Sequence, residues 1–178
     1  MIEPTTGSVI TMAIRRLLRI TQLGLLVGTL PAALATGGQA TLSAQDQAAA
    51  FTAAGAAQTK GMWTMCADDP NTTGARVETV SDLNADGLPD AVIAEDGTFC
   101  YGFTGIGYAI VSKQASGQWR LMSQGAGIPS FLAARGAQGW PDLQIGGPGF
   151  CFPVERWDGT AYSLHRHEYE GKACSPPQ

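Results

Sequence analysis

The residues with the clearest potential for chemistry lie in one nine-residue stretch, 82–90. Oxygen-bearing side chains occupy its positions 1, 3, 5 and 9, which are Asp82, Asn84, Asp86 and Asp90. Calcium and similar hard cations bind six to eight oxygen atoms at about 2.3–2.6 Å, and alternating Asp and Asn residues supply several of them from one loop. Gly87 at position 6 permits the sharp turn that folding around an ion requires. The stretch therefore predicts a calcium site, and the alternative is a tight polar turn, which the same residue types also favour.

The loop resembles an EF-hand over its first nine positions and then departs from that pattern. Position 12, which would be a bidentate Glu in an EF-hand, is Ile93, and the residues 91–94 form an apolar run typical of a buried strand. A loop of this kind leading directly into a strand resembles the FG-GAP or VCBS-type calcium repeat of integrin-like β-propellers, over residues 82–101. The resemblance implies one structural Ca²⁺, held by the side chains of Asp82, Asn84, Asp86 and Asp90 and by the carbonyl oxygen of Leu88.

An internal repeat extends this pattern to the second half of the chain. Residues 87–93 match residues 139–145 in a shared Gly-x-Pro-Asp sequence, and a Phe-Cys pair follows in both halves. Self-similarity at such a period is typical of a repeated β unit. The second copy lacks the acidic side chains, because Ala134, Gly136 and Gln138 stand where the first copy has Asp82, Asn84 and Asp86. Only Asp142 remains, so we expect one cation per chain.

The predicted fold is mainly β, with two blade-like antiparallel units packed as one domain. Residues 61–178 form this β domain, with repeat 1 at about 76–123 and repeat 2 at about 128–170. A short helix is expected between the units, at 129–136, because Ser130 suits a helix N-cap and Gly136 a stop. Residues 36–60 predict an N-terminal arm or short helix. Two repeats are too few to close a propeller, which typically needs four to eight blades.

Residues 1–35 comprise upstream residues, 1–11, and a stretch with the character of a signal peptide. Three arginines, Arg15, Arg16 and Arg19, precede an apolar stretch that ends in Ala33-Leu34-Ala35, the small-x-small form of a signal-peptidase site. The alternative is a membrane anchor, which needs about 20 mostly apolar residues, whereas this stretch is shorter and is broken by Pro31. We expect cleavage after Ala35, or secondarily after Ala44, and translation from either Met1 or Met12. The mature protein is then secreted or periplasmic, without a stable membrane anchor.

The charge of the chain disfavours one class of partner, and its cysteine content predicts disulfide bonds. Residues 36–178 contain eight basic and fourteen acidic side chains, a formal charge of −6, which disfavours nucleic-acid binding. Four cysteines in an exported chain predict two disulfides, for which three connectivities exist. Because Cys100 and Cys151 occupy equivalent positions in the repeat, the favoured pairing is Cys66–Cys100 and Cys151–Cys174.

Two further groups of residues are candidates for function. His165, His167 and Glu168 lie in a predicted strand whose alternation would place both imidazoles on one face, as a second metal site or as a solvated polar face. Six aromatic residues could form either a ligand-binding face or a core: Trp119, Trp140, Trp157, Tyr101, Tyr108 and Tyr162.

The sequence contains no nucleophile motif such as Gly-x-Ser-x-Gly. Residues 147–171 resemble small exported proteins of proteobacteria that have no assigned activity. We therefore expect an exported, non-enzymatic, Ca²⁺-stabilised binding module with an unknown protein or glycan partner. The alternative is a small secreted or periplasmic hydrolase that uses the His165, His167 and Glu168 face.

Overall fold

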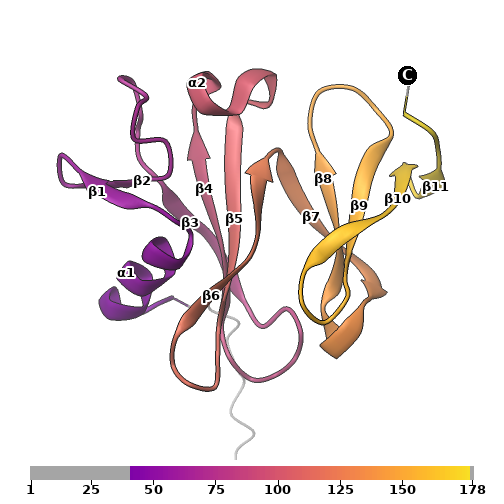
Figure 1. The fold of residues 1–178 in the computed structure, drawn as a ribbon, viewed down its shortest axis with the longest axis horizontal. Coiled ribbons are helices and arrows are strands. Elements are labelled where there is room, and N and C mark those ends of the chain that lie inside the picture. Colours follow the sequence, from indigo (N-terminus) through magenta and orange to yellow (C-terminus); the bar gives the residue numbers. More distant parts are fainter. Residues whose placement is uncertain (1–40, 177–178) are drawn as a thin grey trace, which may run out of the picture. The chain divides into compact units, whose positions relative to one another are not determined.

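The fold is mainly β in a computed structural model that describes residues 41–176, which confirms the predicted class (Figure 1). The predicted targeting segment and the cleavage site after Ala35 lie outside the described residues. Two antiparallel sheets make up most of the described chain, and they belong to one compact unit, Gly37–Gln178. Sheet 1 has the order β3-β4-β5-β6, with strands β3 (Arg76–Ser81), β4 (Asp90–Asp96), β5 (Ile106–Lys113) and β6 (Trp119–Ala126). Sheet 2 has the order β11-β10-β9-β8-β7, with strands β7 (Ile128–Arg135), β8 (Pro141–Gly146), β9 (Phe152–Trp157), β10 (Tyr162–Tyr169) and β11 (Lys172–Ala173).

The two sheets reproduce the internal repeat of the sequence. Each contains a meander of four consecutive strands, and the shared Gly-x-Pro-Asp sequence leads into β4 in the first sheet and β8 in the second. Glycine adopts positive φ at the matching positions of both copies, 84° at Gly87 and 78° at Gly139. The turn before the second strand is therefore retained in the copy that lost its acidic residues.

The helix predicted for 129–136 is wrong. These residues belong to β7, which pairs with β8 from Ile128 to Phe131 and resumes at Arg135 after an irregularity. Pro129 is compatible with this strand because β7 is at the edge of sheet 2, where a missing N–H costs little. The pairing gives β8 a second neighbour, and this non-local gain outweighs the local helix signals at Ser130 and Gly136.

Sheet 1 is buried on both faces, which explains the unbroken apolar run of β4. One face packs against an N-terminal helix through a cluster that includes Phe51, Ile93 and Val111. The other face packs against sheet 2 through a second cluster: Val92, Tyr108, Ile110, Met122, Trp140, Leu143 and Trp157. The two repeats therefore share one core, which places their connecting loops next to each other.

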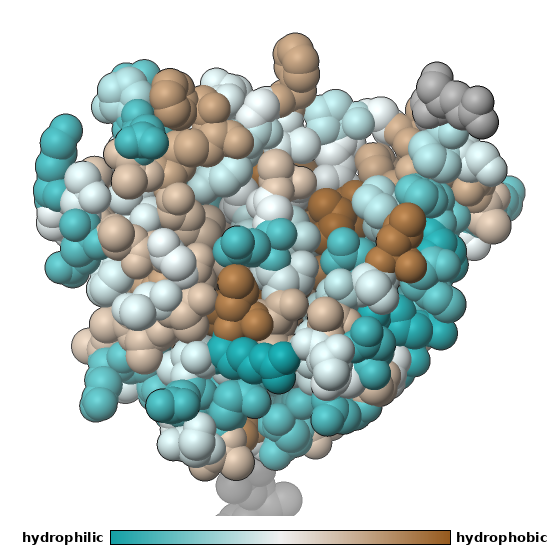
Figure 2. All heavy atoms as spheres, viewed as in Figure 1, coloured by the Kyte–Doolittle hydropathy of each residue, from teal (hydrophilic) through white to brown (hydrophobic). Residues whose placement is uncertain are grey.

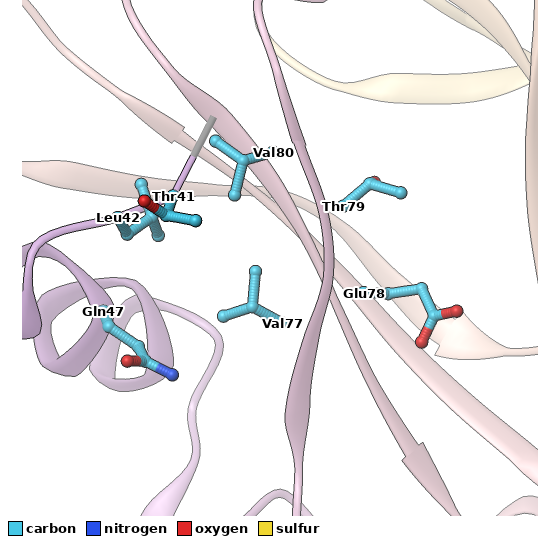
Figure 3. Close-up of a pocket in the computed structure, with 7 residues that line it drawn as sticks. All are labelled: Thr41, Leu42, Gln47, Val77, Glu78, Thr79 and Val80. Atoms are coloured by element: carbon cyan, nitrogen blue, oxygen red, sulfur yellow. The ribbon is translucent and has the colours of Figure 1, made fainter. Parts of the chain in front are cut away.

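The N-terminal arm forms the helix α1 (Ala44–Ala53), followed by the small hairpin of β1 (Ala57–Thr59) and β2 (Met62–Thr64). Asp46 fixes α1 to sheet 1 by accepting a hydrogen bond from Trp119 Nε1 and an ion pair from Lys113. A hollow of about 260 Å³ lies between α1 and β3. In it Val77 and Val80 point toward the helix side, whereas Glu78 points to the opposite side of the strand (Figure 3).

Both disulfides have the predicted pairing, Cys66–Cys100 and Cys151–Cys174. The first joins the segment after β2 to α2 (Thr98–Tyr101), which precedes the 3-10 turn η1 (Gly102–Thr104). The second joins the loop between β8 and β9 to the segment after β11. Within residues 41–176 no helix is both long enough and apolar enough to cross a membrane.

Candidate metal centre

The predicted cation loop connects β3 to β4 and is folded tightly on itself. Asp82 accepts hydrogen bonds from the N–H groups of Asp86 at 3.1 Å and Gly87 at 2.9 Å. Asp86 accepts from the N–H of Leu88 at 2.8 Å and from the Asn84 amide at 3.0 Å. These bonds turn the side chains at positions 1, 3 and 5 into the loop. Each carboxylate oxygen has a further lone pair beyond the one used here.

Asp90 closes the loop at its buried end. The residue has no solvent exposure, and its Oδ2 accepts a hydrogen bond from the N–H of Leu83 at 2.7 Å. Its Oδ1 is the one buried side-chain atom within residues 41–176 that has no hydrogen-bond partner. The side chain of Ser112, opposite Asp90 in β5, acts to lower the pKa of Asp90. It nevertheless makes no hydrogen bond of ordinary geometry to Oδ1.

Burial raises the pKa of Asp90 to about 6, and the charges of Asp86 and Asp82 add to this effect. A carboxylate taken out of water without a partner is costly, so buried charges are normally paired or bound to a metal. A bound cation would supply the partner that Oδ1 of Asp90 lacks.

Glu95 shows how this fold treats a buried carboxylate when all its bonds are made. The residue is 1% exposed and accepts hydrogen bonds from the hydroxyls of Thr64, Thr72 and Tyr101 and from two backbone N–H groups. Burial opposes its ionisation, yet these bonds hold the pKa of Glu95 below its usual value. Glu95 is a structural anchor for the segment after β2, and no motif in the sequence points to it.

Asp142, the counterpart of Asp90 in the second repeat, is compensated by two arginines. Its side chain is fully buried and receives two hydrogen bonds from Arg156, at 2.8 and 2.9 Å, and one from Arg166 at 2.6 Å. Arg156 holds the pKa of Asp142 below its usual value, and Arg166 adds to this effect. In the strand register Ser112 is opposite Asp90, whereas Arg156 reaches Asp142 from the position next to the paired residues Leu143 and Glu155. Two guanidinium groups thus supply positive charge in the repeat that lacks acidic loop residues.

The two loops also contact each other. Arg135 donates hydrogen bonds to the carbonyl oxygens of Leu83 in the first loop and Gly139 in the second. A Cβ added at Gly139 would lie 2.8 Å from the carbonyl oxygen of Asn84. The second loop, which includes the 3-10 turn η2 (Ala137–Gly139), therefore buttresses the first.

The donor set of the first loop fits a hard cation in its chemistry. Three carboxylates, one amide and the Leu88 carbonyl are all oxygen ligands of the type that Ca²⁺ prefers. In the structure these side chains are turned onto N–H groups of the loop, and the described part of the chain contains no three His, Cys, Asp or Glu side chains gathered as a metal cluster. The unpaired oxygen of Asp90 is the observation that favours an ion over an ordinary turn.

The second candidate site has a different arrangement from the regular strand on which its prediction depended. A bulge between Leu164 and Arg166 interrupts the alternation of β10 at His165. Glu168 is bound to Arg166 at 2.7 Å and to the Gln144 amide at 3.4 Å. Glu168 therefore has structural partners of its own in sheet 2.

The aromatic residues divide between the core and the edges of the sheets. Trp140, Trp157 and Tyr162 form a cluster with ring centroids 5.4–6.4 Å apart between the two sheets. Tyr108 is also buried there, while Trp119 contacts α1. Most of these residues thus serve the core between sheets.

Comparisons with known proteins yield no relative for this chain. No family model matches the sequence, no curated protein is similar to it at a significant level, and no solved structure matches it. The resemblance of residues 82–101 to the FG-GAP or VCBS-type calcium repeat stays a prediction.

Proposed function

We propose that this protein is an exported, non-enzymatic binding module whose fold is stabilised by one Ca²⁺ in the loop 82–90. The side chains of Asp82, Asn84, Asp86 and Asp90 and the carbonyl of Leu88 would hold the ion, which would neutralise the three carboxylates. The observation that carries the proposal is the fully buried Asp90 side chain with its unpaired Oδ1.

The contrast between the repeats supports the assignment of a single ion. Asp142 is satisfied by Arg156 and Arg166, so a cation there would compete with two guanidinium groups. The first repeat has no arginine at the corresponding place and retains the acidic loop. One ion per chain is the expected stoichiometry.

Export is supported by the two disulfides, because such bonds persist in oxidising compartments and are rare in the cytosol. The predicted signal segment supports the same localisation. The binding partner of the module is a protein or a glycan. N-terminal sequencing of protein recovered from the periplasm or medium tests export, which the intact N-terminus in cytosolic protein would contradict.

Calorimetric titration of metal-stripped mature protein with CaCl₂ tests the metal site. Calcium sites of extracellular modules have Kd values of about 10⁻⁴–10⁻³ M, so the titration extends into the millimolar range. We expect one site, which Asp82→Ala abolishes. The matched control is Asp96→Ala, which removes an exposed carboxylate at the far end of β4 and should leave binding unchanged. Two sites, no binding, or equal binding in both variants would contradict the proposal.

A further inference from the structure

A polar pocket of about 300 Å³ lies between the two repeats, beside the candidate metal centre. Its walls include Asn84 and Asp86 from the cation loop, Arg120 from β6, Gln138 from η2 and Trp157 from β9. Both sheets and both loops contribute, so the pocket exists only when the repeats are packed together. Its volume is at the lower end of the range for small-molecule sites, about 300–1,000 Å³.

Two glutamine side chains in the pocket are held in defined orientations. The Oε1 of Gln138 accepts a hydrogen bond from Trp157 Nε1 at 3.0 Å, which leaves its NH₂ group as a donor. The Nε2 of Gln114 donates to the carbonyl and the hydroxyl of Ser112, each at 3.2 Å, which leaves its Oε1 as an acceptor. The pocket therefore offers one positioned amide donor and one positioned amide acceptor.

Arg120 is also fixed in place. Its guanidinium carbon lies 5.3 Å from the centroid of the Trp157 ring, and one of its NH₂ groups donates to the Thr160 carbonyl at 2.9 Å. Trp157 is only 2% exposed, so a buried indole holds both the Arg120 guanidinium and the Gln138 amide in place. The remaining N–H groups of Arg120 add planar donors.

This lining selects against several classes of ligand. An apolar ligand would cover these partly exposed polar groups and take water from them without replacing its hydrogen bonds, which is costly. A cation would meet the guanidinium of Arg120, and an anion would meet the carboxylate of Asp86 until Ca²⁺ neutralises it. An uncharged ligand with closely spaced hydroxyl groups, each both donor and acceptor, satisfies both amides and the remaining N–H groups of Arg120. Figure 2 shows that hydrophilic residues predominate at the lower end of the view, where the β3–β4 and β5–β6 loops lie in Figure 1. Strongly hydrophobic residues lie nearer the middle.

We propose that this pocket binds one neutral sugar residue of a glycan. The inference rests on the proposed function, because Asn84 and Asp86 belong to the cation loop and an ion there would fix this wall of the pocket. Ca²⁺ is therefore expected to increase the affinity for the sugar by fixing this wall.

Nuclear magnetic resonance of the mature protein with Ca²⁺ tests the proposal. The probes are the methyl glycosides of glucose, galactose, mannose and N-acetylglucosamine, and the reporter is the indole N–H resonance of Trp157. We expect at least one probe to shift this resonance saturably, while that of Trp63 stays unchanged, because Trp63 is stacked on Phe51 beside α1. If no probe shifts the Trp157 resonance, or if Trp63 responds equally, the sugar site is refuted.

A variant pair separates the pocket from the metal centre. Gln138→Leu should weaken sugar binding at least tenfold while retaining the rise in melting temperature that Ca²⁺ causes, and Gln58→Leu, an exposed change in β1, should alter neither. Equal sugar affinity in Gln138→Leu would overturn the proposal. Calcium binding without sugar binding would refute the pocket alone. Sugar binding that EDTA leaves unchanged would support the pocket and contradict its coupling to the calcium site.

Discussion

Asp90, Glu95 and Asp142 are all buried, yet their carboxylates have three different surroundings. Hydroxyls and backbone N–H groups surround Glu95, two arginines hold Asp142, and Asp90 keeps one oxygen unpaired. Because an unpaired buried charge is costly, the difference between Asp90 and Asp142 locates the candidate ion at the level of a single atom.

The arginine pair on Asp142 predicts a large effect of Asp142→Asn. The change leaves two guanidinium groups beside a neutral side chain, and we expect a loss of about 3 kcal/mol in the free energy of unfolding, the lower end for breaking a buried ion pair. The lower end applies because the side chains of Arg156 and Arg166 are 36% and 30% exposed and can turn toward water. Urea denaturation measures this effect. Asp96→Ala, which removes the exposed pair with Arg76, should cost at most about 1 kcal/mol.

The same substitution has a defined pH dependence. Since the pKa of Asp142 is lowered in the folded protein, its ionised form stabilises the fold above the unfolded pKa of about 3.9. This contribution is lost as pH falls through the folded pKa. The stability difference between wild type and Asp142→Asn should therefore be full at neutral pH and narrow below about pH 4. A difference that stays constant through this range would argue against the ion pair.

At the scale of elements, the contact between the two loops predicts a coupling to the ion. Gly139→Ala places a Cβ against the Asn84 carbonyl at a residue with φ of 78°, and should lower Ca²⁺ affinity about tenfold, or 1.4 kcal/mol. The control Gly171→Ala has a similar φ of 74° and no atom within 4 Å of the added Cβ. It shares the backbone strain but not the contact, and its Ca²⁺ affinity should match wild type. Calcium titration of both variants makes the comparison, and equal affinities would disprove the coupling.

Each disulfide joins one repeat to a segment that flanks it. Their sequence separations of 34 and 23 residues predict that each stabilises by about 3–4 kcal/mol, chiefly by restricting the unfolded chain. We expect Cys66→Ser/Cys100→Ser and Cys151→Ser/Cys174→Ser to lower the free energy of unfolding by similar amounts, as measured by urea denaturation. A much larger effect of one pair would mean that this bridge also maintains native packing.

At the scale of the whole molecule, local patterns in the sequence were sufficient for most of the strands and for the repeat. The apolar runs of β4 and β5, the turn residues of the hairpins and the matching Phe-Cys pairs all depend on neighbours in the chain, and so they predict the sheets and the disulfide pairing. The strand β7 was missed because its pairing with β8 outweighs the helix signals at Ser130 and Gly136.

The compensation of buried charge was not predictable in the same way. Arg156 and Arg166 reach Asp142 from two neighbouring strands, and two of the three hydroxyls around Glu95 come from residues 23 and 31 positions away. No spacing rule encodes these contacts, since they depend on how the strands align. The candidate loop itself was predictable because all its donors lie within nine residues.

Thermal denaturation of wild type and Asp90→Asn, each with EDTA and with millimolar CaCl₂, tests the central claim most directly. A ligand that binds only the native state stabilises by about 2.7 kcal/mol at one hundred times its Kd, so Ca²⁺ should raise the wild-type melting temperature by several degrees. Asn removes the charge but can still accept the Leu83 N–H. In EDTA at pH 7 the variant should therefore melt no lower than wild type, and Ca²⁺ should not change its melting temperature. An unchanged wild-type melt, or an equal rise in both proteins, would contradict a calcium ion at Asp90.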